Sequence, residues 1–184
     1  GGLRLLYTLA ESNNLEDQRN LAKNIAVLSE NEKNKIRMVL EGGLKALGPL
    51  STSVDETIVV ESAMTFRNLC HKDELKSTII RGGGLTLCAN FAASEVPEVH
   101  LYAAQALHFV SDKPDVQYRL VGDKRCLNAM FSLANSVDRE VQEHAVNALG
   151  NMSGNPDCQR LLVDGGNLRL IVKLARSRNL TVQM

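Results

Sequence analysis

The sequence contains no tryptophan, and aromatic residues make up only 4% of its 184 residues. Leu, Ala, Val and Ile must therefore form the core, which the 44% hydrophobic content allows. Small and medium side chains of this kind suit layers of packed helices. The sequence also lacks net charge, because 21 Lys and Arg balance 21 Asp and Glu. No net basic field exists to attract phosphates, so we expect no nucleic-acid partner.

Long apolar runs and secretion signals are missing too. No stretch approaches the roughly 18 apolar residues that a membrane-spanning helix needs, and no secretory signal is visible. We therefore expect no integral membrane segment and a cytoplasmic protein, with a nuclear location left open. The four cysteines are far apart and form no CxxC pair, so they predict reduced thiols rather than a zinc or redox site. They are Cys70, Cys88, Cys126 and Cys158.

Catalytic patterns are equally scarce. The four histidines have no HExxH or paired-carboxylate context, and His100 and His108 are eight residues apart, which is the wrong spacing for a joint metal site on one helix. The Gly82–Gly84 run could hold an anion at a helix start. The same glycines recur elsewhere without a Lys-Ser/Thr partner, which favours a helix break. We expect no enzyme activity, no metal and no cofactor.

One constant repeat period organises the chain. The string GGL recurs at positions 1–3, 42–44 and 83–85, a step of 41 each time. The next step falls at Arg125, where the glycine is lost. A second register agrees, because Ala22, Ala63 and Ala104 share the same spacing. Two motifs with one period indicate a repeat architecture.

Each unit is predicted to contain three helical pieces. A short polar segment ends at the glycines, which adopt positive φ at low cost. A second segment follows, as at 44–50 and 168–175, and then a loop and the longest helix. The short polar segments are 32–40, 73–81, 114–121 and 156–163, and the long helices are 16–29, 55–70, 97–111 and 138–153.

The long helices have one apolar face. Their apolar or small residues follow the i, i+4, i+7, i+8, i+11 spacing of a buried helical stripe. The stripe comprises Ile58, Ser62, Thr65, Phe66 and Leu69, then Val99, Ala103, Ala106, Leu107 and Val110, then Val141, Ala145, Ala148, Leu149 and Met152. One unit cannot bury this face alone, so neighbouring units must stack.

Two strings carry a resemblance to a known family. Residues 141–153, VQEHAVNALGNMS, resemble the third helix of an armadillo repeat, and residues 155–166, NPDCQRLLVDGG, resemble the first helix of the next one. The resemblance implies an all-α, right-handed α-solenoid of about four stacked repeats. We expect partial repeats at 1–29 and 154–184 and repeats at about 30–70, 71–111 and 112–153.

The end of the chain repeats the opening of a long helix, since Val182 and Gln183 follow Val141 and Gln142 by the same repeat step. We therefore expect a fragment of a longer array. Exposed apolar ends of such an array can pair, so end-to-end self-association is expected.

Armadillo arrays such as β-catenin and importin-α bind extended peptides along the concave surface formed by their third helices. A recurring Asn there binds the peptide backbone, and in importins a Trp lies four residues earlier. The Asn positions correspond here to Val27, Asn68, Phe109 and Asn151. The Trp positions correspond to Lys23, Met64, Gln105 and Asn147, none of them aromatic, which argues against recognition of nuclear-localisation peptides.

Helix geometry supports the same surface. At about 100° per residue, three positions on each long helix share a face beside the buried stripe. The twelve candidate partner-binding residues are Asn20, Lys23, Val27, Glu61, Met64, Asn68, Tyr102, Gln105, Phe109, His144, Asn147 and Asn151. Their amides, aromatics, Met and His are typical of binding sites. Packing against neighbouring helices is the alternative, above all for Val27 and Phe109.

The predicted function is a non-catalytic scaffold or adaptor that binds an extended peptide or protein segment. Two alternatives remain: a regulatory or chaperone-like array that grips a folded partner such as a small GTPase or motor, and a ligand-sensing regulatory region of a larger enzyme. On the scaffold hypothesis, alanine at Asn68 or Asn151 should weaken partner binding and leave helix stability nearly unchanged.

Overall fold

The computed structural model describes residues 6, 8–163 and 172, and these residues are mostly helical, with no strand among them. The predicted all-α class is confirmed. The expected second segment at 168–175, the Gly165-Gly166 pair and the repeat opening near Val182 lie outside the described residues, as does the first GGL motif.

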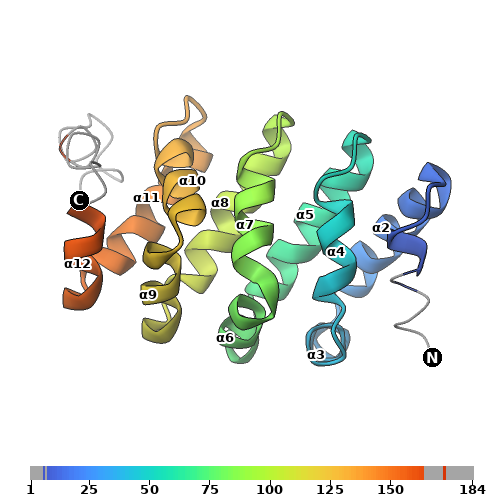
Figure 1. Cartoon of the computed structure of the whole chain (residues 1–184), viewed down its shortest axis with the longest axis horizontal. Coiled ribbons are helices and arrows are strands. Elements are labelled where there is room, and N and C mark those ends of the chain that lie inside the picture. Colours follow the sequence, from blue (N-terminus) through green and yellow to red (C-terminus); the bar gives the residue numbers. More distant parts are fainter. Residues whose placement is uncertain (1–5, 7, 164–171, 173–184) are drawn as a thin grey trace.

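The helices follow one another in a repeating order of short, short and long (Figure 1). The long helices are α2 (Leu15–Leu28), α5 (Glu56–Cys70), α8 (Pro97–Val110) and α11 (Arg139–Ser153). The first helices are α3 (Glu32–Leu40), α6 (Lys76–Ile79) between short turns η1 (Asp73–Leu75) and η2 (Ile80–Gly84), α9 (Pro114–Gly122) and α12 (Pro156–Leu162). The second helices are α4 (Leu44–Leu50), α7 (Leu85–Ala92) and α10 (Lys124–Ala134).

Glycines separate the first and second helices in two units. Gly42 and Gly83 adopt positive φ angles of 86° and 108°, a conformation that is strained for other residues. The third unit breaks differently, because Gly122, which ends α9, does not adopt a positive φ. Asp123 caps α10 there, because its carboxylate accepts hydrogen bonds from the backbone N–H groups of Arg125 and Cys126.

The long helices begin where the sequence provides capping residues. Asn14, Asp55 and Asp138 each accept a backbone hydrogen bond in the first turn of the helix that follows. Helix α8 begins instead with Pro97, whose fixed φ suits the first helical position.

The predicted apolar stripes of α5, α8 and α11 form the core. All fifteen of their residues are buried. Successive long helices pack against each other, α2 on α5, α5 on α8 and α8 on α11, while the second helices form a separate row in front of them (Figure 1). A continuous core across stacked units follows, as expected of a solenoid.

Polar contacts between units repeat the period of the sequence. Lys72 binds Glu32, Lys113 binds Asp73 and Lys76 binds Asp112, across separations of 40, 40 and 36 residues. These pairs lie where the first helix of one unit meets the preceding unit. The register found in the sequence is therefore also the register of the packing.

Candidate functional site on the long-helix face

The twelve candidate residues occupy one face of four successive long helices. On α2, Asn20, Lys23 and Val27 are exposed, and 67% of the Val27 surface is accessible. On the other three helices every candidate is partly exposed except Asn68, of which 9% is accessible. The partly exposed group consists of Glu61, Met64, Tyr102, Gln105, Phe109, His144, Asn147 and Asn151.

The asparagine positions pack against the end of the preceding long helix. The amide of Asn68 donates to Ser29 Oγ over 3.0 Å, and the amide of Asn151 donates to Ser111 Oγ over 2.9 Å. Ser29 and Ser111 are the residues that cap α2 and α8. In both units one asparagine donor is thus used to join neighbouring repeats.

Between these two junctions, the same place is occupied by a pair of rings. Phe109 stands at the asparagine position of α8, and His71 caps α5. Their ring centroids lie 5.0 Å apart in an edge-on arrangement, which is a favourable geometry for aromatic rings. The array therefore uses a polar pair at the α2–α5 and α8–α11 junctions and an aromatic pair at the α5–α8 junction.

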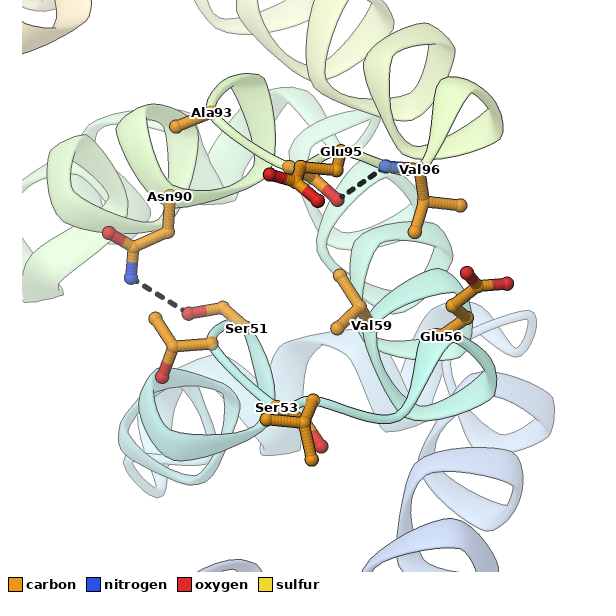
Figure 2. A pocket seen from close by; sticks show the side chains of 11 residues that line it. Ser51, Ser53, Glu56, Val59, Asn90, Ala93, Glu95 and Val96 are labelled. Carbon is orange, nitrogen blue, oxygen red and sulfur yellow. Dashed lines mark hydrogen bonds between the residues drawn. The ribbon is translucent and has the colours of Figure 1, made fainter.

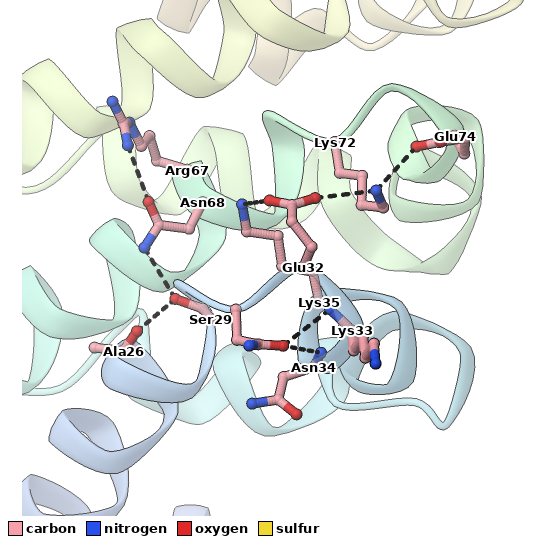
Figure 3. A network of polar contacts seen from close by, with 11 residues as sticks. Ala26, Ser29, Glu32, Lys33, Asn34, Lys35, Arg67, Asn68, Lys72 and Glu74 are labelled. Carbon is pink, nitrogen blue, oxygen red and sulfur yellow. Dashed lines mark hydrogen bonds and ion pairs between the residues drawn. The ribbon is translucent and has the colours of Figure 1, made fainter.

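Asn68 belongs to a buried chain of hydrogen bonds (Figure 3). Arg67 donates to Asn68 Oδ1, Asn68 donates to Ser29 Oγ, and Ser29 donates to the carbonyl of Ala26. This alters the expectation for alanine at position 68. Loss of a buried hydrogen bond costs about 0.5–1.5 kcal/mol, so stability should fall rather than stay constant.

Figure 3 also shows the ion pairs that lie beside these hydrogen bonds. The carboxylate of Glu32 binds Lys35 and Lys72, and these bonds lower the pKa of Glu32 to about 2, with Lys35 as the larger cause. Lys35 is buried although it carries charge. The junction of the first two described units is consequently held by charge as well as by apolar packing.

Phe109 packs against the core, as the alternative interpretation of its position expected. The residue is only partly buried, so some of its surface stays accessible. The Arg67 guanidinium lies 5.6 Å from the ring centroid, and Arg67 Nε donates to Gln105 Oε1 over 3.1 Å. Arg67 thus contacts three of the candidates, Gln105 and Phe109 on α8 and Asn68 on α5.

Two further contacts fix side chains on this face. Tyr102 donates to a carboxylate oxygen of Glu98, and burial together with this bond raises the pKa of Tyr102. His108 and His144 place their Nδ1 atoms 3.1 Å apart, so one ring donates to the other. Burial, and then the neighbouring His144, lowers the pKa of His108.

Arg67, His71 and His108 were not among the candidates. A comparison of registers would have found Arg67, because the matching positions of the other long helices carry Ala26, His108 and Gly150. A long, positively charged side chain at a position where two other units carry a small residue can be detected from the sequence. His71 has no comparable signal, since it lies just beyond the helix.

A pocket of 530 Å³ lies away from this face (Figure 2). The loops that follow α4 and α7 form it, and Asn90 donates to Ser51 Oγ at one side. Glu56 and Glu95 stand at its edges. It brings none of the twelve candidates together.

Other kinds of site are absent from the described part of the chain. No group of three His, Cys, Asp or Glu residues is placed to hold a metal ion there. The four cysteines are free and buried. None of the helices within the described ranges combines the length and apolarity needed to cross a membrane.

No protein-family model and no curated protein matches the chain. Several solved structures are similar to the chain. One engineered protein has a TM-score of 0.81 at 30% identity, and the match covers 100% of this chain and 45% of that one. A structure of computationally designed armadillo repeat proteins for modular peptide recognition has a TM-score of 0.83 at 22% identity, with 100% and 78% covered.

A designed armadillo repeat protein in complex with the peptide (KR)4 has a TM-score of 0.80 at 18% identity, with 99% of this chain and 77% of that chain covered. These similarities agree with the repeating helices, the stacked long-helix layer and the constant repeat period of the sequence. The chain therefore has the armadillo-repeat fold and is an all-α solenoid.

Proposed function

We propose that the chain is a non-catalytic scaffold that binds an extended segment of another protein across its long helices. The observation that carries this proposal is the row of partly exposed amide, aromatic, Met and His side chains on α5, α8 and α11. Surface helices normally present Lys and Glu to water, whereas this row has the composition of a binding surface.

The row offers what an extended peptide requires. A peptide that loses water along one side needs partners for its N–H and C=O groups, and a side-chain amide supplies both a donor and an acceptor. Gln105 and Asn147 are partly exposed amides on adjacent helices, and Tyr102 adds apolar area beside them. Asn151 keeps an oxygen that accepts no hydrogen bond from the described residues.

The solved structures support the general function. Two of them are designed armadillo proteins, one for modular peptide recognition and one in complex with (KR)4. We do not expect the same ligand here, because no aromatic residue occupies positions 23, 64, 105 or 147. We further propose repeat boundaries near 30–70, 71–111 and 112–153, and a cytoplasmic location, which four free buried thiols suit.

Selection of peptides from a random displayed library, followed by calorimetry, tests the proposal. Tyr102→Ala and Asn147→Ala should each weaken binding of a selected peptide about tenfold. Tyr118→Ala on α9 and Asn128→Ala on α10 are matched controls, since both residues are exposed away from the long-helix face. Thermal melts of all four variants exclude unfolding as the cause.

Other results would identify a different function. If only an intact folded domain bound, and short peptides did not compete with it, the chain would be an array that grips a folded partner. Saturable binding of a metabolite without peptide binding would indicate a sensing region. Equal losses from the two control substitutions would show that the long-helix face is not the binding surface.

A further inference from the structure

We infer that Arg67 is an anion-recognition residue that binds an acidic side chain of the extended peptide. This inference rests on the proposed function and specifies the chemistry of its ligand. Arg67 projects from the last turn of α5 onto the candidate face, in the middle of the described array. It is partly buried, so its interactions are less screened by solvent than those of an exposed cation.

Neutral groups hold the guanidinium in place. Nε donates to Gln105 Oε1 over 3.1 Å, Nη1 donates to Asn68 Oδ1 over 3.0 Å, and the ring of Phe109 lies 5.6 Å away. Asn68 is itself fixed by Ser29 (Figure 3). Two helices therefore orient Arg67 before any ligand arrives, which lowers the entropic cost of binding.

Within the described part of the chain, no carboxylate is paired with the charge of Arg67. Several other cations at the unit junctions are paired with carboxylates: Arg19 with Asp55, Lys72 with Glu32, and Lys76 with Asp73 and Asp112. The exposed Arg125 instead donates to the hydroxyl of Thr86. Arg67 forms no ion pair with any carboxylate of the described residues. The end of α5 favours a cation through the helix dipole, but it provides no carboxylate partner for the guanidinium.

Donors remain available as well. A guanidinium has five N–H groups, of which two are used by Gln105 and Asn68. Nη2 donates to none of the described side chains. Its two N–H groups and the second N–H of Nη1 match the oxygens of a carboxylate, the group that arginine binds with most specific geometry.

The surroundings favour an anion over a cation. His71 and His108 lie around the same Phe109 ring, with centroid distances of 5.0 and 6.2 Å. Glu61 and Glu98 lie toward the opposite end of the long helices, Glu61 six residues before Arg67 on α5 and Glu98 near the start of α8. Asp112 and Glu143 lie near His108, where Asp112 is paired with Lys76, and neither forms an ion pair with Arg67. A peptide that crosses the helices at the level of Arg67 therefore meets the charge of Arg67 and the aromatic ring of Phe109.

Three capped octapeptides, acetylated and amidated so that only side chains carry charge, test the inference: (SE)4, (SQ)4 and (SK)4. Heteronuclear NMR of the whole chain detects millimolar binding and follows the Arg67 Nε–H signal directly. We expect (SE)4 to bind about tenfold more tightly than (SQ)4, to shift that signal, and to lose this advantage in high salt.

Arg67→Gln should abolish the preference for (SE)4, and Arg67→Lys should restore part of it through charge without the fork of donors. Arg119→Gln, an exposed arginine on α9, is the matched control and should leave the preference unchanged. Equal binding of (SE)4 and (SQ)4, or a preference that survives Arg67→Gln, would overturn the inference.

The two proposals fail separately. If library-selected peptides shift amide signals along the long helices but carry no acidic residue, and (SE)4 leaves Arg67 unchanged, the anion site is refuted and the scaffold function stands. If no peptide shifts any signal on this face, both are refuted.

Discussion

Ser62 lies within the core of α5, fully buried, and its hydroxyl forms no hydrogen bond to the described residues. The matching residues of the next two long helices are Ala103 and Ala145, which are also buried. Ser62→Ala should therefore stabilise the array, because the repeat itself shows that alanine fits this position.

The expected gain follows from three contributions. Relief of an unsatisfied buried hydroxyl is worth about 1–3 kcal/mol. Alanine is also the better helix former, by at most about 0.7 kcal/mol. Against these, the space left by one oxygen atom costs less than about 1 kcal/mol, the cost of a methyl-sized cavity. The net stabilisation should be about 1–2 kcal/mol.

Thermal and urea unfolding followed by circular dichroism measure the effect. A chain of this size should melt about 2–8 °C higher. Ser132→Ala, at an exposed position of α10, is the control and should show only the gain in helix propensity. If Ser62→Ala is no more stabilising than Ser132→Ala, the buried hydroxyl does not destabilise the fold and the reasoning is wrong.

Three further predictions concern pH, backbone and thiols. Lys35 and Lys72 lower the pKa of Glu32 from 4.5 to about 2, so the contribution of Glu32 to stability should be complete above pH 4.5 and disappear as the pH falls toward 2. The melting temperature should therefore change less with pH across this range in Glu32→Gln than in the unaltered chain. Gly83→Ala should destabilise the chain by roughly 1–2 kcal/mol in urea titrations, because the φ angle of Gly83 is positive. Gly48→Ala should instead stabilise the chain by about 0.5–1 kcal/mol, because Gly48 lies inside α4 with open space where the new methyl group would stand. Burial raises the pKa of all four cysteine thiols, so a disulfide reagent should label them only as fast as the chain opens, and rapid labelling of native protein would contradict this.

Much of the fold could be predicted because every unit repeats the same signals. The expected bounds of the long helices differ from the observed ones by no more than one residue, and the predicted stripes are buried. The third unit shows where the pattern was insufficient. Its helix break uses a capping Asp123 in place of a glycine with positive φ, and a motif search for GGL does not detect a capping carboxylate.

The candidate face was harder to predict in detail. Helical spacing places a residue on a face, but it does not say which neighbour that residue binds. Asn68 was expected to offer its amide to a ligand. In the structure its side-chain N–H donates to Ser29 and its side-chain oxygen accepts from Arg67. Contacts of this kind depend on side-chain orientation across two helices, and the repeat period of a sequence does not contain that information.

The short reach of the junction contacts has a consequence for biosynthesis. Among the described residues, no side-chain hydrogen bond joins groups more than 41 positions apart, the separation between Cys126 and Leu85. Each new segment of about that length can therefore dock on the segment before it as soon as it leaves the ribosome, without waiting for the distant end of the chain. Low contact order also favours fast folding. An array built in this way can gain a unit by duplication and fold it by the same step.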